Sequence, residues 1–435
     1  MQVIVLGAGL LGVTTAYYLA REGHQVTVID RQPEPARETS FANAGLLTPG
    51  HAYAWASPRA PMILLKSLWR ADTALRWRLK PDPGMWAWGI KFLANCTAAR
   101  NRENTVIKVR LCLYSLAETA RVTAETGIAW DRSQSGALYL YRDPEHFRAG
   151  RENFKLLGDE GVEAKTLDAE ALFDFEPSLA GMKGRFAGAI HTPHDESGDA
   201  RKFTVALADV LRSRGVSFRL GETVLSMTRS GDRITGVETM THLADNRDLG
   251  AGLRVTTHRG HRIEGDAYVL ALGSYSPLLT KPLGLRMPIY PVKGYSITLP
   301  ITDPAAAPAH FGVDEANLVA FARLGDRLRL TATADFAGYD TSFTAGDFAH
   351  MLRVAMELFP RAAAYDRPDY WACLRPMTPD GPPIIGPSPI KNLWLNTGHG
   401  HIGWTMACGS SRMLVDLISG RRPEIDAAPF RLSRY

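Results

Sequence analysis

The first thirty residues contain residue types and spacings that suit the binding of a dinucleotide. A Gly-x-Gly-x-x-Gly pattern at residues 7–12 follows an apolar, β-branched run at residues 3–6. A helix is predicted for residues 13–22, and a second apolar run at residues 25–29 ends on Asp30. Glycines at these spacings allow a tight turn, close approach of the backbone to a pyrophosphate and close packing of helix on strand. Free N–H groups at the helix start then bind phosphate, and Asp30 accepts hydrogen bonds from ribose hydroxyls.

The glycine pattern by itself predicts a dinucleotide without separating NAD from FAD. A chance glycine-rich turn is the alternative, but it would not require strand, helix, strand and acid in this order. Small residues at 39–45 would also let backbone N–H groups reach a cofactor, although an ordinary loop explains them equally well. The residues expected at the cofactor in the first segment are Gly7, Ala8, Gly9, Leu10, Leu11 and Gly12.

Length, charge and cysteine usage limit the class of protein. The chain has 435 residues, which predicts two domains. Its net charge of +5 favours anionic partners such as a phosphate-bearing cofactor, a carboxylate substrate or an anionic membrane surface, and is too weak to predict nucleic-acid binding. The four cysteines are scattered, so neither a zinc site nor a disulfide framework is expected. With no signal-peptide pattern and no apolar stretch of about eighteen residues, a cytoplasmic location is expected.

The rest of the chain alternates helical and extended patterns, which predicts an α/β unit combined with a second sheet. Residues 61–92 interleave tryptophans, apolar residues and basic residues, including Trp69, Arg70 and Arg78. Such a segment either lies on a membrane surface or is a surface helix packed on its own domain. The other predicted elements are helices at 101–126, 203–214 and 345–359 and strands at 216–220, 233–237, 252–262, 267–272, 290–299 and 327–332.

Several longer motifs together resemble those of the D-amino-acid oxidase-like flavoproteins, which include glycine oxidase and sarcosine oxidase. Within that superfamily the chain looks most like the small, catalytic subunit of bacterial D-amino acid dehydrogenases, over nearly its whole length. The motifs that carry the resemblance are residues 7–12 with Asp30 and Arg31, and residues 38–45, 95–100, 268–276, 290–296, 374–376, 378–381, 396–400 and 403–409.

The resemblance implies an α/β, Rossmann-like FAD-binding domain interleaved with an α+β substrate-binding domain built on an antiparallel sheet. It assigns residues 1–50, 186–284 and 372–435 to the FAD-binding domain, and residues 51–185 and 285–371 to the substrate-binding domain. It also makes the cofactor FAD and turns the 39–45 loop into a flavin contact. The further residues that it places at the cofactor are Asp30, Arg31, Thr39, Ser40, Ala42, Asn43, Ala44, Gly45, Leu46, Val224, Leu272, Gly273, Gly398, His399, Gly400, Ile402, Gly403, Trp404 and Thr405.

Enzymes of this superfamily transfer the Cα hydrogen of an amino acid as hydride to flavin N5, and the imine is then hydrolysed to a 2-oxo acid and ammonia. The substrate carboxylate needs a planar, doubly donating partner, and Arg375 matches the arginine with this role in related oxidases. A structural ion pair is the alternative for Arg375. Lys293 and Tyr295 belong to a strand that covers the active site in relatives. Lys293 would hold a water or act on the flavin unless it is solvated, and Tyr295 would line the pocket unless it belongs to the core.

Residues 398–403 precede a helix predicted at 404–418, whose N–H groups and dipole would face the reduced flavin. His399 and His401 have no carboxylate or thiolate companions, so no metal is expected. His401 stands where a small residue is usual in the dehydrogenases, and His51 lies in the loop after the flavin contacts. Both histidines would add polar recognition, which suggests a cyclic or hydroxylated substrate such as D-proline or hydroxy-D-proline.

Cys373 raises the question of how the flavin is held. Sarcosine oxidases resemble this region and tether their flavin through a cysteine near this strand, whereas glycine is usual here in the dehydrogenases. A covalent link through Cys373 is therefore the minority interpretation. A buried, unreactive thiol beside non-covalent FAD is favoured.

Three functions follow from these observations. The main prediction is a D-amino acid dehydrogenase that passes electrons from reduced FAD to a membrane quinone or another carrier. An oxygen-using oxidase of D-amino acids, glycine or sarcosine is the first alternative, and the FAD-binding subunit of a hetero-oligomeric dehydrogenase is the second. Arg375 argues against a subunit without catalytic activity, and the oligomeric state is left open.

Overall fold

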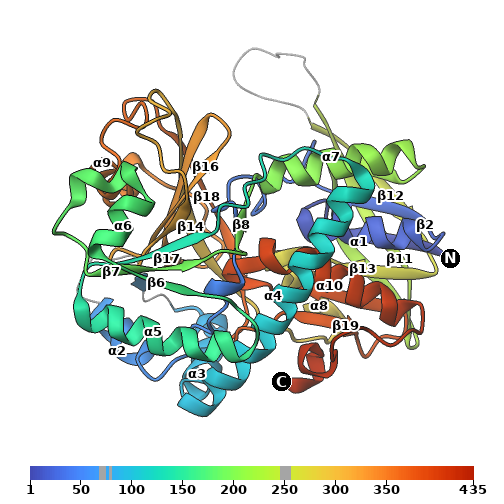
Figure 1. Cartoon of the computed structure of the whole chain (residues 1–435). Coiled ribbons are helices and arrows are strands. Elements are labelled where there is room, and N and C mark those ends of the chain that lie inside the picture. The colour runs from blue at the N-terminus through green and yellow to red at the C-terminus, as the bar shows by residue number, and fades with distance from the viewer. Residues whose placement is uncertain (68–74, 78–80, 245–255) are drawn as a thin grey trace.

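The computed structural model describes residues 1–67, 75–77, 81–244 and 256–435. A six-stranded and a nine-stranded sheet lie on opposite sides of the molecule, and two helices cross the space between them (Figure 1). These helices are α4 (Ala98–Thr126) and α10 (Gly403–Ile418). Within the described ranges, no helix combines the length and the apolar character needed to cross a membrane.

The six-stranded sheet contains the predicted dinucleotide-binding unit. Its order is β19-β20-β13-β1-β2-β9, and its neighbours are parallel except for β19 and β20. Helix α1 (Leu10–Arg21) begins directly after Gly7-Ala8-Gly9, here called the glycine turn, and three residues before its predicted start at residue 13. The strands are β1 (Gln2–Leu6), β2 (Gln25–Asp30), β9 (Ser217–Leu220), β13 (Ala267–Leu270), β19 (Ile384–Pro387) and β20 (Leu393–Thr397).

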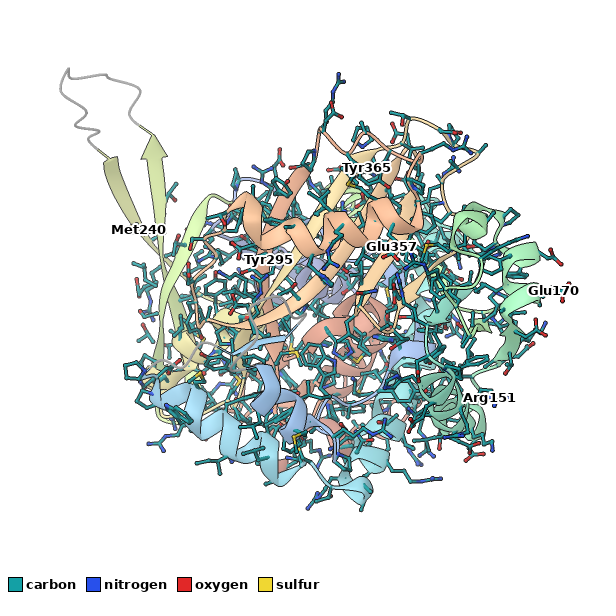
Figure 2. All side chains as sticks on the ribbon, turned by 90° about the vertical axis from the view of Figure 1, so that its left-hand side faces the viewer. Arg151, Glu170, Met240, Tyr295, Glu357 and Tyr365 are labelled. Atoms are coloured by element: carbon teal, nitrogen blue, oxygen red, sulfur yellow. The ribbon has the colours of Figure 1, made fainter. Side chains whose placement is uncertain are left out.

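The two faces of this sheet are buried against different layers. Val3 and Val5 pack with helices α1, α7 and α10, whereas Ile4 and Leu6 pack with a three-stranded antiparallel sheet. This division arises because successive strand residues point to opposite faces. The outer part of the three-stranded sheet projects from the body near Met240 (Figure 2). The elements added here are α7 (Ala200–Ser213), β10 (Glu222–Ser230), β11 (Arg233–Ala244) and β12 (Thr256–Ile263).

The nine-stranded sheet has the order β18-β14-β17-β16-β15-β5-β7-β6, with β4 paired to β17. Its neighbours are antiparallel except for β15 with β5 and β17 with β4, which confirms the predicted second sheet. Helix α9 lies across its strands, with Glu357 on the helix (Figure 2). The elements are β4 (Leu75–Trp77), β5 (Ala137–Tyr141), β6 (Lys165–Asp168), β7 (Gly188–Thr192), β14 (Tyr290–Pro300), β15 (Phe311–Asp314), β16 (Val319–Leu324), β17 (Arg327–Phe336), β18 (Asp369–Met377) and α9 (Ala349–Leu358).

The described part of the segment at 61–92 forms two helices and, between them, strand β4, which pairs with β17; residues 68–74 and 78–80 lie outside the described part of the chain. Trp69, Arg70 and Arg78 fall in those two gaps. Residues 252–255 of the predicted hairpin also lie outside the described part. The remaining elements are α2 (Ala60–Ser67), α3 (Pro83–Ala94), α5 (Pro144–Asp159), α6 (Ala169–Phe175), α8 (Ser276–Thr280), β3 (Leu46–Leu47) and β8 (Glu196–Ser197).

The pairing of strands β7 and β18 concerns the boundary between the two predicted domains. Strand β7 and most of β18 lie within the ranges 186–284 and 372–435 that the sequence assigns to the FAD-binding domain, yet both strands pair in the nine-stranded sheet. Strand β7 pairs there with β5 and β6, and β18 pairs with β14. The division of the chain into two discontinuous domains stays a prediction.

A Gly12→Ala substitution tests the contact between α1 and β1. A Cβ atom at this position would lie 1.8 Å from the carbonyl oxygen of Gly7, so the helix would have to move away from the strand. We expect a loss of about 2 kcal/mol or more in the free energy of unfolding, measured by urea denaturation. Gly158→Ala on α5 is the matched control because its Cβ would meet no atom within 4 Å. That control should gain about 0.5–1 kcal/mol, and equal behaviour of the two variants would contradict the contact.

Candidate active site

One cavity of about 1020 Å³ runs from the glycine turn of the six-stranded sheet to the inner side of the nine-stranded sheet. A cavity of this size is sufficient for a large cofactor together with a small substrate. The structure brings the predicted cofactor and substrate residues together around it. The predicted residues that do not line it are Ala8, Gly12, Lys293, Gly398 and Thr405.

The glycine turn has the close backbone contacts that its spacing predicts. Gly7 has φ +110°, and a Cβ there would lie 2.7 Å from the carbonyl oxygen of Ala271. Asp30 accepts hydrogen bonds from the N–H groups of Ala8 at 2.6 Å and Gln32 at 2.8 Å, while its side chain still borders the cavity. Burial raises the pKa of Asp30. Because a carboxylate accepts about four hydrogen bonds, Asp30 retains capacity for a ribose hydroxyl.

Arg31 is held at the same end of the cavity by Glu38 and Tyr275, which belong to the recognised motifs but were not predicted as site residues. Its guanidinium donates to Glu38 at 2.6 Å and lies over the ring of Tyr275, 4.1 Å from the ring centre. Gln32 donates to the same carboxylate at 2.6 Å. Glu38 and Tyr275 also line the cavity, so they form part of its wall beside the second strand.

Hydrogen bonds tie the loop at residues 39–46 to both sheets. Ser40 accepts a bond from the N–H of Leu10 at the start of α1, at 3.2 Å. Thr39 donates to the carbonyl oxygen of Leu374 in β18, at 2.9 Å. The loop therefore connects the glycine turn with the strand that carries Arg375, which an ordinary surface loop would not do.

Arg375 reaches the cavity from β18, and a bulge in β17, on the other side of β14, anchors it. Its guanidinium donates to the carbonyl oxygen of Thr333 at 2.7 Å. Thr333 has φ +60° and lies where the pairing of β14 with β17 shifts by one residue. The bulge turns this carbonyl toward Arg375. A Cβ at Gly294 would lie 2.4 Å from the guanidinium carbon, so the glycine leaves the space that the arginine occupies.

The guanidinium of Arg375 has no acidic side chain as a hydrogen-bond partner among the described residues. Burial lowers its pKa to about 10, so it remains charged at neutral pH. An enclosed cation whose partner is a backbone carbonyl is available for an anion in the cavity. Gly294 could have been noticed from its place in the Tyr-Pro-Val-Lys-Gly-Tyr motif, whereas no sequence signal marks Thr333.

Lys293 is placed differently from its predicted position. Its side chain is 1% exposed, and its ammonium donates to the carbonyl oxygen of Ser342 at 2.7 Å, outside the cavity lining. It is therefore neither solvated nor aimed at the site, because its position in β14 directs it toward the 340–342 segment. Tyr295 does border the cavity, but its hydroxyl donates to Asp335 at 3.0 Å, which fixes it within the sheet. Figure 2 shows Tyr295 within the body of the molecule, near α9.

The two histidines predicted at the substrate end lie side by side in an aromatic group. His51 stacks on Tyr139 with ring centres 5.8 Å apart and meets His401 edge-on at 6.1 Å. His401 stacks on Trp55 at 4.8 Å. Burial lowers the pKa of His51 to about 4 and that of His401 well below its usual value. Both rings are therefore neutral at pH 7 and offer hydrogen bonds without charge.

The third histidine, His399, is buried and shares a hydrogen bond with the hydroxyl of Ser410 at 2.9 Å. Burial lowers its pKa to about 3. It precedes α10, whose first residue Gly403 borders the cavity, so the N–H groups of the first helical turn are near the cavity wall. This arrangement places the positive end of a helix dipole beside the cavity.

Five lining side chains have buried polar atoms without a hydrogen-bond partner within the described chain: the hydroxyls of Tyr53 and Ser296, the indole N–H groups of Trp371 and Trp404, and the amide oxygen of Asn396. An unpaired buried polar group is costly, so such atoms indicate a ligand with complementary groups. FAD carries phosphates, hydroxyls and ring heteroatoms, and the glycine turn, Asp30 and the start of α10 suit these groups. The residues present therefore fit FAD.

Comparison with known proteins gives a consistent result. A family profile described as FAD dependent oxidoreductase matches residues 2–417. The chain is 45% identical over 435 residues to a D-amino acid dehydrogenase of Methylobacterium nodulans, covering 100% of this chain and 99% of that protein. It is 43% identical over 427 residues to D-amino acid dehydrogenase 2 of Mesorhizobium japonicum, covering 98% of each.

Solved structures show the same fold at lower sequence identity. Glycine oxidase from Geobacillus kaustophilus aligns with a TM-score of 0.76 and 21% identity over 100% of this chain and 98% of that one. L-proline dehydrogenase from P. horikoshii aligns with a TM-score of 0.72 and 18% identity over 100% and 97%. With the profile match and the full-length relatives, these findings show that the chain belongs to the family of FAD dependent oxidoreductases.

Proposed function

We propose that this enzyme oxidatively deaminates D-amino acids to 2-oxo acids and ammonia and passes the electrons to a quinone or another carrier. The observation that carries the proposal is Arg375, an enclosed cation without an acidic partner, in the same cavity as the dinucleotide-binding turn. The names of the full-length relatives support the substrate class. When bound, FAD supplies the acceptor for the hydrogen and electron pair that leave the substrate Cα.

The protein side of this reaction is binding and orientation. Arg375 holds the substrate carboxylate, Thr333 fixes the guanidinium, and Gly294 leaves its space free. Positioning the carboxylate also orients the Cα–H bond, and such preorganisation contributes strongly to rate. Neutral His51 and His401 face the side chain of the substrate with hydrogen-bonding atoms on aromatic walls. This combination favours cyclic or hydroxylated substrates such as D-proline and hydroxy-D-proline.

Variants at the arginine anchor test the proposal by anaerobic flavin reduction with D- and L-amino acids, cyclic ones included. We expect reduction by D-amino acids only. Arg375→Lys keeps the charge but loses the planar fork, so kcat/KM should fall roughly 10- to 100-fold. The kcat/KM of Gly294→Ala should fall by a comparable factor, because the added Cβ displaces the guanidinium of Arg375. Gly260→Ala on β12, whose Cβ would approach no atom closer than 3.9 Å, should match the wild type.

The outcomes separate the parts of this proposal. Reduction by L-amino acids alone would contradict the proposed substrate class. Unchanged kcat/KM in Arg375→Lys would remove the arginine from carboxylate binding. Turnover of plain aliphatic D-amino acids only would refute the preference attributed to His51 and His401 while leaving the reaction itself intact.

We also propose that FAD is held without a covalent bond. Cys373 borders the cavity, but its thiol is 8% exposed and burial raises its pKa to about 11. The thiolate is the reactive form of cysteine, so this thiol is poorly suited to attack a flavin at neutral pH. Its nearest polar neighbour is the hydroxyl of Thr39, at 3.5 Å.

Acid denaturation of the holoenzyme tests how the flavin is held. We expect all flavin in the supernatant because no thioether joins it to the chain, measured by absorbance of the supernatant and the washed pellet. Cys373→Ser should contain the same amount of flavin per protein as the wild type. A yellow pellet from the wild type that turns colourless in Cys373→Ser would establish the covalent link instead.

For the electron acceptor, we propose a quinone reached through a membrane surface. Helices α2 and α3 expose a group of large apolar side chains, while the inner side of α3 is buried in the core. Ile63, Leu64 and Phe92 of these helices also border the cavity, so an apolar path connects it to this surface. The exposed side chains, here called the α2–α3 apolar surface, are Met62, Ile63, Leu65, Trp86, Ile90 and Leu93.

Electron transfer to ubiquinone in anionic vesicles tests the apolar surface. Ile90 is 70% exposed. The substitution Ile90→Asp should lower the rate of ubiquinone reduction about tenfold or more, because it weakens contact with the bilayer. A water-soluble dye acceptor should be reduced at the wild-type rate, and Met356→Asp, exposed on α9, should change neither rate. Stoichiometric hydrogen peroxide without quinone reduction would identify the oxygen-using oxidase instead.

A further inference from the structure

A carboxyl group lies in the cavity beyond the two histidines. Glu315 follows strand β15 and borders the cavity, with its carboxylate oxygen 3.9 Å from Nδ1 of His51. His51 in turn meets His401, and Arg375 acts on His401 through its charge. Arg375, His401, His51 and Glu315 therefore form a series along the cavity, with a cation at one end and an acid at the other.

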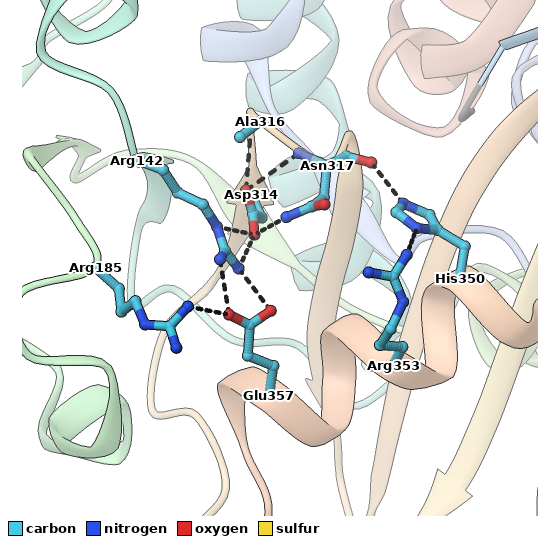
Figure 3. Close-up of polar contacts among 8 residues, drawn as sticks. All are labelled: Arg142, Arg185, Asp314, Ala316, Asn317, His350, Arg353 and Glu357. Atoms are coloured by element: carbon cyan, nitrogen blue, oxygen red, sulfur yellow. Dashed lines mark hydrogen bonds and ion pairs between the residues drawn. The ribbon is translucent and has the colours of Figure 1, made fainter. Parts of the chain in front are cut away.

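The turn that carries Glu315 is firmly held (Figure 3). Asp314, fully buried, accepts hydrogen bonds from the N–H groups of Ala316 and Asn317 and from the guanidinium of Arg142 at 2.8 Å. Arg142 also bonds Glu357 of α9 at 2.9 Å. The N–H of Glu315 donates to the carbonyl oxygen of Leu140 in β5, at 3.1 Å. The direction of the Glu315 side chain is thus set by a fixed backbone.

The other acidic side chains that line the cavity already have partners within the described chain. Asp30 accepts two backbone N–H groups, and Glu38 is paired with Arg31. The carboxyl of Glu315 accepts no hydrogen bond from the described residues. The ionisable side chain that faces it is His51, at 3.9 Å, and burial keeps this imidazole neutral. Glu315 therefore enters the cavity as an acid without a counter-charge.

Among the described residues, no cation acts on Glu315 itself. Lys108, whose charge acts on His51 and His401, donates to the carbonyl oxygen of Tyr53 at 2.8 Å. The hydroxyls of Tyr53, Tyr139 and Tyr141 have pKa values raised by burial and, further, by the charge of Glu315, so they stay neutral. Asp314 has its own partner in Arg142. Burial, followed by the charge of Asp314, raises the pKa of Glu315 to about 7. A cation from a ligand would relieve this cost, since an enclosed charge is stable only when paired.

We propose that Glu315 binds the distal ammonium or guanidinium of a substrate side chain, so that long, cationic D-amino acids are among the preferred substrates. The inference rests on the proposed function of the same cavity. A substrate carboxylate at Arg375 places its α-amino group close to that arginine. Only a group further along an extended side chain passes His401 and His51 to reach Glu315. Ring hydroxyls stop at the histidines, so both kinds of recognition fit one cavity.

Binding without turnover tests the subsite directly. 6-Aminohexanoate and hexanoate share a carboxylate for Arg375, but only the first carries a distal ammonium. Titrations followed by the flavin absorbance of the holoenzyme at pH 8 keep Glu315 ionised and the amine protonated. We expect 6-aminohexanoate to bind roughly 10- to 100-fold more tightly, as for a charged hydrogen bond. Equal affinities would overturn the proposal.

The variant Glu315→Gln keeps the size of the side chain and removes the charge. It should abolish the preference for 6-aminohexanoate while hexanoate binding and flavin content stay at wild-type values and Tm does not fall. Glu170→Gln, on the exposed helix α6 at the rim of the molecule (Figure 2), is the matched control and should retain the preference. A preference that persists in Glu315→Gln would overturn the assignment of the subsite.

Flavin reduction by D-lysine and D-norleucine separates this inference from the proposed function. D-Lysine should have a KM roughly 10- to 100-fold lower than D-norleucine in the wild type, and Glu315→Gln should remove that difference with little change for D-norleucine. Equal KM values with good turnover would overturn the inference and keep the function. Selective binding of 6-aminohexanoate without reduction by any D-amino acid would keep the subsite and overturn the function.

Discussion

Helix α1 lies against strand β1 with no side chain between Gly12 and the carbonyl oxygen of Gly7. This contact fixes the start of the helix behind the glycine turn, where the N–H of Leu10 meets Ser40. The loop that contains Ser40 then reaches Leu374 through Thr39. These contacts therefore link the cofactor end of the cavity to the strand that carries Arg375. A shift at the glycine turn would displace the cofactor residues and this strand together.

The sequence allowed the fold class and the cofactor end of the site to be predicted because their signals are local. The glycine spacing and Asp30 are adjacent to the elements that they serve, and Arg375 was found through a motif. Lys293 was expected at the active site, but successive side chains of a strand point to opposite faces of the sheet, and that of Lys293 reaches the carbonyl oxygen of Ser342 instead. Glu315 was missed because its position in the cavity depends on residues that are distant in the sequence, such as His51.

The polarity of the cavity changes along its length. A charged guanidinium at Arg375 is followed by the neutral rings of His401 and His51, and then by the acid Glu315. Aromatic walls lower the local dielectric, so each charged end interacts strongly with a ligand group of opposite charge. The spacing of charges thus selects for the length of a ligand, while the aromatic middle selects for its shape.

The last consequence concerns synthesis of the chain. Helix α10 (Gly403–Ile418) borders the cavity, packs on both α1 and α4, and lies near the C-terminus. Strand β13 likewise pairs with β1 from later in the sequence, and β20 pairs with β13. The cavity wall is therefore complete only once residues 403–418 have been synthesised, and until then the faces of the N-terminal unit that α10 covers stay exposed.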